Sequence, residues 1–250
     1  MCRHLAYIGP PIPLSRLLFD PPHALVRQAW EPHDMRGGGT INADGFGVGW
    51  YPDPGAEPVR YRRDRPIWSD PLLPELAPVT RAGAVLAAVR AASTGMPLVE
   101  TACAPFTGDG WLFSLNGRVT GWPDSVAGLA QRLPVTDLLT MEAPVDSALL
   151  WALVRHRLRG GASPAEAVAA TVAEVAAAAP GSRLNVLLAD PDTIVATTLT
   201  HSLSVRSGDG STLVSSEPLD DDPGWRPLPD GVLVVATAES VEIIEKGFPP

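Results

Sequence analysis

The sequence is poor in cysteine, which limits both disulfides and metal sites. Cys2 and Cys103 are the two cysteines of the 250-residue chain, so a disulfide framework is excluded. We expect free thiols, with a single bridge between them as the alternative. The five histidines show no metal-ligand spacing with these cysteines. We therefore expect no metal and no other cofactor.

Positive charge and long apolar runs are scarce as well. Lysine and arginine total 19 against 28 acidic residues, which gives a net charge of -9, and no lysine run or basic amphipathic arm is present. Nucleic acid is therefore not an expected partner. The apolar stretch at residues 5–8 is too short for a signal peptide, and no later run would span a bilayer. These absences favour a cytoplasmic protein with no membrane partner that acts on a small polar molecule.

The apolar segments that are present predict an α+β fold in a single domain, residues 1–250. Strand-like runs come first, two helices follow, and further strand-like runs end the chain. Such segregated blocks predict antiparallel sheets with helices on their outer faces. The predicted strands are 5–8, 45–51, 59–63, 84–90, 111–115, 184–189, 194–200, 203–206, 212–216, 232–236 and 241–245; the predicted helices are 147–159 and 163–179, after short helical pieces at 14–19 and 25–30.

Two local patterns add detail to these elements. Glycines alternate with larger residues through 45–51, which predicts a strand that another backbone or a ligand approaches closely. Ser163 and Glu166 have the spacing of a capping box at the start of the second helix.

Cys2 is the first candidate for chemistry. Initiator methionine is normally removed before a small residue, and removal of Met1 would leave Cys2 with a free α-amine. Such an amine has an unperturbed pKa of about 7.7 to 8.0, so it can take the thiol proton and return it to a leaving amine. The thiolate would attack an amide carbonyl and form a thioester that water hydrolyses. The alternative is an inert residue at a frayed terminus.

Asn116 and Gly117 are candidates for stabilising an oxyanion. The pair ends the apolar run at residues 111–115, and an amide side chain with an unhindered backbone N–H supplies the two donors that an oxyanion needs. Asn-Gly is also the commonest hairpin-turn signal, so a turn is the alternative.

Arg90, Ser93, Thr94 and Asp146 are candidates for holding a substrate. Arg90 ends a predicted strand, where its guanidinium would grip a carboxylate in bidentate fashion, with the hydroxyls of Ser93 and Thr94 nearby. A solvated strand-end arginine is the alternative. Asp146 would pair with an ammonium group, although an aspartate before a helix is first of all an N-cap. The acidic run 220–222 would meet a cationic leaving amine or form a solvated turn, and the turn is favoured.

The order of these motifs resembles the class II glutamine amidotransferase domain, over nearly the whole chain. The resemblance is carried by Met-Cys-Arg-His at the start, Asn42-Ala43-Asp44-Gly45-Phe46-Gly47-Val48-Gly49-Trp50, Arg90 to Gly95, Asn116-Gly117 and Asp146-Ser147. Within the family, Asp20-Pro21-Pro22 and the segments 89–97 and 216–222 are most similar to the hydrolases that cut γ-glutamyl-hercynylcysteine sulfoxide in ergothioneine biosynthesis.

The resemblance implies a four-layer αββα N-terminal-nucleophile fold and a γ-glutamyl amidohydrolase with a small-molecule substrate. It implies Cys2 as the nucleophile and Asn116 with Gly117 as the oxyanion hole. It also implies Arg90 on the glutamyl carboxylate and Asp146 on the glutamyl ammonium. A γ-glutamyl group presents a carboxylate, an ammonium and a reactive carbonyl at fixed distances, and these residue types answer each of the three.

Two departures from the family pattern concern the secondary contacts. Many members have histidine before the Asn-Gly pair, where this chain has Leu115, and histidine where it has Thr94. Two other functions stay open. One is a glutaminase subunit that feeds ammonia to a separate partner synthase, and the other is a non-enzymatic binding module that keeps the fold. The joint presence of the motif residues argues against the module.

Overall fold

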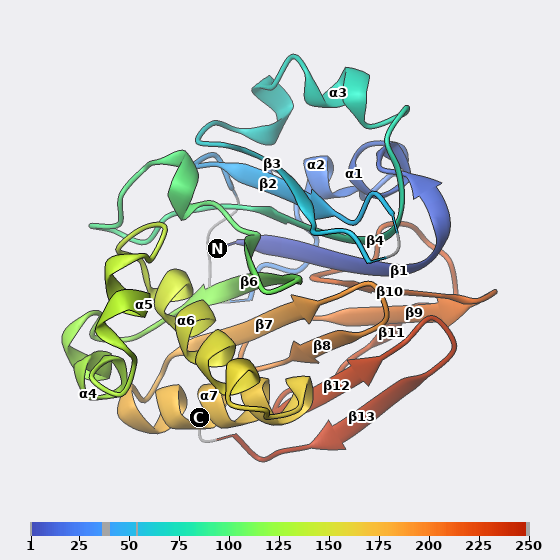
Figure 1. Ribbon diagram of the computed structural model, residues 1–250. Coiled ribbons are helices and arrows are strands. Elements are labelled where there is room, and N and C mark those ends of the chain that lie inside the picture. Colours follow the sequence, from blue (N-terminus) through green and yellow to red (C-terminus); the bar gives the residue numbers. More distant parts are fainter. Residues whose placement is uncertain (1, 37–40, 54, 249–250) are drawn as a thin grey trace.

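The computed structural model describes residues 2–36, 41–53 and 55–248, and two β-sheets lie at its centre (Figure 1). Sheet A contains β1 (Arg3–Pro13), β2 (Phe46–Trp50), β3 (Val59–Arg63), β4 (Arg81–Val89), β9 (Ser204–Gly208), β10 (Ser211–Ser215) and β11 (Arg226–Pro227), in the order β11-β9-β10-β1-β4-β2-β3. Sheet B contains β5 (Phe106–Gly108), β6 (Trp111–Arg118), β7 (Arg183–Ala189), β8 (Ile194–Thr197), β12 (Val232–Ala236) and β13 (Val241–Glu245), in the order β13-β12-β8-β7-β6-β5. Neighbouring strands run antiparallel.

Helices cover the outer face of each sheet. The two long helices, α6 (Asp146–Arg159) and α7 (Pro164–Ala178), pack on sheet B, while the short α1 (Ser15–Leu18), α2 (Leu25–Gln28) and α3 (Leu73–Leu76) lie on the side of sheet A (Figure 1). The short α4 (Ala127–Ala130) and α5 (Val135–Leu139) and three 3₁₀ turns, η1 (Ile67–Ser69), η2 (Glu100–Ala102) and η3 (Asp124–Val126), complete the helical elements of the described chain. This arrangement confirms the predicted α+β class and its αββα layers.

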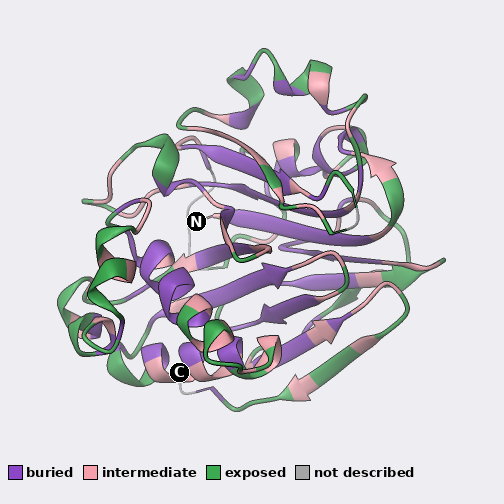
Figure 2. Ribbon diagram, in the orientation of Figure 1, coloured by how far each residue is buried: buried purple, intermediate pink, exposed green. Residues whose placement is uncertain are grey.

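Three apolar cores hold the layers together, and β1 contributes to two of them. Ala6 and Ile8 of β1 face the core between the sheets, whereas Leu5 and Tyr7 face the core under α1 and α2. This is the alternation that a strand imposes on successive side chains. Full burial of a side chain such as Leu5 contributes roughly 1.5 to 3 kcal/mol. Because both faces of β1 are buried (Figure 2), the residues at its start are held in a fixed place.

Both local patterns seen in the sequence are confirmed. Ser163 Oγ accepts the Glu166 N–H at 3.3 Å and Glu166 Oε2 accepts the Ser163 N–H at 3.0 Å, which is the reciprocal capping box. In β2, a Cβ on Gly47 would lie 2.2 Å from the carbonyl oxygen of Ala104. The glycine pattern therefore lets the segment around Ala104 lie directly on this strand.

Three further observations concern membrane-spanning helices, metal sites and disulfides. In the described ranges, no helix combines the length and the apolar character needed to cross a membrane. The same ranges bring no three His, Cys, Asp or Glu side chains together as a metal site. Cys2 and Cys103 are both free, which confirms the prediction of unpaired thiols.

Candidate active site

Cys2 lies directly before β1, where sheets A and B come together. Its neighbour Arg3 pairs with Val89, the last residue of β4, so the thiol sits beside the chain that leaves β4. The Sγ atom lies 3.8 Å from the carbonyl oxygen of Ala91. Burial raises the pKa of the Cys2 thiol, and the nearby positive charge of Arg90 acts in the opposite direction. Ionisation of this thiol therefore needs a base close by.

A single cavity next to Cys2 collects most of the predicted site residues. It has a volume of about 30 Å³, and its lining includes Cys2, Arg90, Ser93, Gly117 and Asp146. The loop after β4, the end of β6 and the start of α6 converge there. We call this space the Cys2 cavity. Thr94, in contrast, is exposed and is not part of the lining, so Ser93 is the one of the two predicted hydroxyl residues that borders the cavity, together with Ser147.

Arg90 presents a buried and unused hydrogen-bond donor at this cavity. The residue is 9% exposed, so the alternative of a solvated arginine is wrong. Its backbone is fixed on both sides, because its N–H donates to Gly45 O at 2.7 Å and its carbonyl accepts from Asp44 N at 2.9 Å. The Nη1 atom is buried without a hydrogen-bond partner among the described residues. Leaving such a donor unpaired costs about 1 to 3 kcal/mol or more, so a bound carboxylate would be held strongly.

Asp44 is a positioning residue to which the sequence analysis gave no role. Its Oδ2 accepts the Ala92 N–H at 2.8 Å, while its own N–H holds Arg90. The side chain thus fixes the segment from Arg90 to Ala92 against the start of β2. The motif that begins at Asn42 contained this residue, but nothing local in the sequence tells which backbone group it would bind.

Asp146 carries a buried carboxylate into the same cavity. Val145 occupies the N-cap position of α6, so Asp146 is the first helical residue and the predicted cap is one residue off. Its Oδ1 accepts from Ser147 N at 2.8 Å and its Oδ2 from Val119 N at 3.0 Å. Burial raises the pKa of this carboxyl, while the two backbone donors and Arg90 oppose the rise. A carboxylate has lone pairs left beyond these two bonds, so an ammonium group can still bind.

Asn116 lies inside β6, opposite Asn185 of β7, so the hairpin-turn alternative is wrong. The side chain is completely buried, and its Nδ2 donates to Ser216 Oγ over 3.4 Å. The Oδ1 atom of Asn116 has no hydrogen-bond partner in the described part of the chain. A half-turn about χ2 exchanges the amide oxygen and nitrogen, so an N–H can be offered to a substrate carbonyl.

Gly117 needs to be glycine for a reason separate from catalysis. A Cβ at this position would lie 1.8 Å from the carbonyl oxygen of Arg183 on β7. No side chain fits in that space, so the backbone of Gly117 stays uncovered where it borders the Cys2 cavity. The same close packing that excludes a side chain keeps the peptide accessible to a ligand.

Ser216 connects the start of β1 to Asn116, and no local pattern in the sequence indicates this connection. Its Oγ accepts the His4 N–H at 2.9 Å and lies 3.2 Å from His4 O, in addition to its contact with Asn116. His4 itself is fully buried, with Nδ1 3.1 Å from Ser114 Oγ. Burial lowers the pKa of His4 to about 3, so this ring is neutral at physiological pH.

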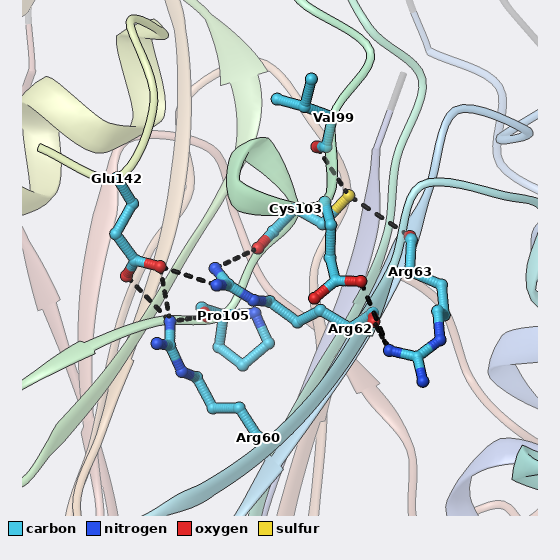
Figure 3. A network of polar contacts seen from close by, with 8 residues as sticks. Arg60, Arg62, Arg63, Val99, Cys103, Pro105 and Glu142 are labelled. Atoms are coloured by element: carbon cyan, nitrogen blue, oxygen red, sulfur yellow. Dashed lines mark hydrogen bonds and ion pairs between the residues drawn. The ribbon is translucent and has the colours of Figure 1, made fainter.

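A pair of arginines supports the wall of the site (Figure 3). Arg60 and Arg62 of β3 both bind Glu142, at 2.8 and 2.7 Å, and we call these three residues the arginine clamp. The same guanidinium groups donate to backbone carbonyls of the segment 103–105 at 3.2 Å. Ala104 lies in that segment and Ala102 directly before it, and both line another small cavity at Cys2. Because Glu142 precedes Asp146 by four residues, the clamp ties this wall to the segment that leads into Asp146 at the start of α6.

The remaining candidates lie away from the chemistry. The Cys103 thiol is buried, which raises its pKa to about 11, and its Sγ contacts Arg63 O at 3.4 Å. Asp220 accepts from Arg206 and from the Trp225 indole at 2.9 and 2.7 Å. The acidic run 220–222 therefore finds partners within the chain, and none of its members lines the Cys2 cavity.

Sequence comparisons identify the family and the relatives to which this chain is similar. The family model described as glutamine amidotransferases class-II matches residues 25–207. A γ-glutamyl-hercynylcysteine sulfoxide hydrolase of Mycolicibacterium smegmatis is 40% identical over 234 residues, which cover 94% of this chain and 95% of the relative. The enzyme of the same name from Mycobacterium tuberculosis is 38% identical over 245 residues, which cover 97% and 96%.

Solved structures show the same fold. The glutamine aminotransferase class-II domain protein of Silicibacter pomeroyi superposes with a TM-score of 0.67 at 26% identity, over the full length of both chains. The glutamine phosphoribosylpyrophosphate amidotransferase of Bacillus subtilis gives a TM-score of 0.68 at 12% identity, over 97% of this chain and 49% of that enzyme, and this likeness concerns the fold alone.

Proposed function

Since this chain belongs to the class II glutamine amidotransferase family, we propose that it hydrolyses the γ-glutamyl amide of γ-glutamyl-hercynylcysteine sulfoxide in ergothioneine biosynthesis. The products are glutamate and hercynylcysteine sulfoxide. Two relatives that bear this activity in their names match the chain over almost its whole length. We further propose that residues 1–250 act as one domain in the cytoplasm, without a metal, another cofactor or an obligatory partner.

The observation that carries the proposal is the convergence of a thiol, a guanidinium and a carboxylate on one small cavity. Arg90 Nη1 is the unpaired donor for the α-carboxylate of the glutamyl group. Asp146 accepts the α-ammonium, and the approach of that cation lowers the pKa that burial had raised. Ser93 lines the same cavity. The two charges fix the acyl chain, so its γ-carbonyl is presented to Cys2.

The first half of the reaction forms a thioester. After removal of Met1, which lies outside the described residues, the free α-amine of Cys2 takes the thiol proton. The thiolate attacks the γ-carbonyl carbon, and the resulting oxyanion accepts hydrogen bonds from the Asn116 amide and the Gly117 N–H. When the tetrahedral intermediate collapses, the C–N bond breaks and the α-ammonium returns the proton to the leaving amine.

The second half regenerates the enzyme. Water attacks the thioester carbon while the α-amine of Cys2 accepts its proton. The same two donors stabilise the second oxyanion. Collapse breaks the C–S bond, releases glutamate and restores the thiol.

The test of the proposed nucleophile combines intact mass with chemical modification. We expect the purified protein to lack Met1 and to gain a single adduct on Cys2 with an electrophilic diazo-ketone analogue of glutamine. Cys2→Ala should abolish both the adduct and turnover, while Cys103→Ala should keep both. Turnover in protein that retains Met1, or in Cys2→Ala, would reject the mechanism.

A glutaminase subunit is the second candidate, because the family includes enzymes that transfer the amide nitrogen. That function predicts rapid turnover of glutamine that rises on addition of a partner synthase. A hydrolase acting alone should instead prefer the γ-glutamyl derivative of a larger amine, and kcat/KM for the two substrates separates the alternatives.

A further inference from the structure

Ser216 lies directly after β10 and is completely buried between the start of β1 and the end of β6. Two of its groups contact the backbone of His4, because its N–H donates to His4 O at 2.9 Å and its Oγ accepts the His4 N–H at 2.9 Å. The same Oγ meets the side-chain amide of Asn116, which comes from the opposite sheet. One hydroxyl therefore joins the strand that follows the nucleophile to the expected oxyanion donor.

The contact between Ser216 and Asn116 is long for the orientation that the amide has in the structure. Asn116 Nδ2 and Ser216 Oγ lie 3.4 Å apart, whereas an ordinary N–H···O bond measures about 2.7 to 3.2 Å. Asn116 Oδ1 at the same time has no hydrogen-bond partner among the described residues. A buried acceptor without a partner destabilises the fold. Both ends of this amide are therefore poorly bound in the absence of a substrate.

A serine hydroxyl can bind the amide in either orientation, because it has one proton to donate and two lone pairs that accept. When Nδ2 faces Ser216, Oγ accepts from Asn116 and His4, and its proton points to His4 O at 3.2 Å. When Oδ1 faces Ser216, the proton turns to Oδ1, and His4 O keeps the backbone N–H of Ser216. The second arrangement loses no hydrogen bond and leaves both N–H groups of the Asn116 amide for a ligand.

The charge that develops on the substrate selects between the two orientations. An oxyanion is stabilised by N–H groups directed at it and repelled by an amide oxygen. We propose that Ser216 is a positioning residue of the reaction, whose O–H binds Asn116 Oδ1 and thereby directs Asn116 Nδ2 at the substrate oxygen. Ser216 itself does not line the Cys2 cavity, so it acts through Asn116. This inference rests on the proposed function, since it assigns a task at the oxyanion hole of that reaction.

Ser215 offers a matched control next to Ser216. It is also completely buried, and its Oγ has no hydrogen-bond partner in the described ranges. Ser215 pairs with Leu5, whose side chain faces the core under α1 and α2. Directly paired residues of neighbouring strands have their side chains on the same face of the sheet. The Ser215 hydroxyl therefore lies on the face away from Asn116, and its removal should leave the amide unchanged.

The first experiment is a double-mutant cycle that measures kcat and KM with γ-glutamyl-hercynylcysteine sulfoxide and with glutamine. Ser216→Ala should lower kcat about tenfold or more and leave KM within about twofold, since the amide loses the partner that orients it. Ser215→Ala should keep both values. In the Asn116→Ala background, Ser216→Ala should cause no further loss of kcat, because the amide through which Ser216 acts is gone. Equal losses of kcat in the two backgrounds would overturn the inference.

An alternative variant covers the case in which Ser216→Ala does not fold. Ser216→Cys keeps a side chain of similar shape with a weaker donor, so it carries the same cycle under the same criterion. The two outcomes for the proposed function are also distinct. If the wild-type enzyme hydrolyses neither substrate, the proposed function is wrong and the inference falls with it. If the wild-type enzyme is active and the cycle is additive, the inference alone is wrong.

Alkylation of Cys2 by iodoacetamide gives the second readout. This reaction needs the thiolate but displaces iodide from a saturated carbon, so it forms no oxyanion. Its rate at Cys2, followed by mass spectrometry with peptide mapping, should be the same in wild type and Ser216→Ala. A slower alkylation in Ser216→Ala would show that Ser216 holds the nucleophile through His4, and would overturn its assignment to the oxyanion donor.

Discussion

Polar side chains near Cys2 and those around Asp109 differ in whether they have hydrogen-bond or ion-pair partners within the protein. In the described chain, buried side-chain atoms without a protein partner include Arg90 Nη1, one end of the Asn116 amide, His4 Nε2 and His201 Nδ1. Asp109, in contrast, binds the guanidinium groups of Arg155 and Arg159 at 2.8 and 2.7 Å, and these two arginines hold the pKa of its carboxyl well below the usual range.

Paired and unpaired polar groups have opposite effects on the stability of the fold. Charges that pair with one another in the folded protein serve the fold, and at an exposed position each pair stabilises it by about 1 kcal/mol or less. Buried donors and acceptors left unpaired destabilise the fold by about 1 to 3 kcal/mol each, so they persist where a ligand completes them. Among these atoms, Arg90 Nη1 belongs to a residue that lines the Cys2 cavity, so it marks the same place as the cavity does.

After Cys2→Ala, the largest loss of activity is expected for Asn116→Ala. If the unpaired amide is an oxyanion donor, kcat should fall by about 10²- to 10³-fold, with little change in KM. Steady-state kinetics with a γ-glutamyl substrate measure this. Asn185→Ala, on the neighbouring strand, gives a comparison at an amide that already binds His201 O at 2.9 Å. An unchanged kcat in Asn116→Ala would remove Asn116 from the reaction.

Arg90→Lys sharpens the comparison at the carboxylate site. Lysine keeps the charge but loses the planar fork, so kcat/KM should fall by about 10- to 100-fold. The matched control is Arg155→Lys in the Asp109 cluster, where we expect kcat/KM to stay at the wild-type value. Equal kcat/KM for Arg90→Lys and wild type would move the carboxylate site elsewhere.

Two buried histidines predict acid sensitivity. Burial lowers the pKa of His201 to about 4 and of His4 to about 3, below the value near 6.5 of an unfolded chain. The unfolded state therefore takes up protons first, and stability present above pH 6.5 is lost as the pH falls toward 4. Between pH 7 and pH 5, the free energy of unfolding of the wild type should drop by about 2 kcal/mol more than that of His201→Gln.

Urea unfolding at several pH values measures this difference. His156→Gln, at an exposed position on α6, should follow the wild type. Parallel pH profiles for wild type and His201→Gln would show that His201 takes up its proton equally in both states.

The smallest effect is expected in the arginine clamp. Glu142→Gln removes the charge that Arg60 and Arg62 share, and these pairs are partly exposed. We expect KM to rise about threefold because the segment that leads into Asp146 is displaced, with kcat within twofold of wild type. Added salt should raise KM in the wild type and have less effect in the variant. Asp109→Asn is the matched control; an equal change in KM there would indicate a general loss of stability.

Most strands were predictable because their signals are local. Short apolar or glycine-spaced runs gave β2, β3 and β12 within a residue of the observed bounds. The strand β11 was missed because it has two residues and one is a proline. At Asn116-Gly117 the local signal favoured a turn, but the two residues lie in β6 and pair with β7.

The residues that line the candidate site were predictable from the sequence, and the residues that hold them in place were not. Cys2, Arg90 and Asp146 were found from residue type and order. The bonds from Asp44 to Ala92 and from Asn116 to Ser216 join positions 48 and 100 residues apart, and no local pattern reports such contacts. Glu142 and the wall segment 103–105 were missed for the same reason.

The bond between His4 and Ser216 spans 212 residues, and this has a consequence for the timing of synthesis. The start of β1 is enclosed only when β10 pairs with it, and β10 is made near the end of translation. During most of elongation β1 therefore lacks this partner strand. Under the proposed mechanism, an incomplete chain could already expose the α-amine of Cys2, but the segments that surround this residue would be held in place only after β10 has paired with β1.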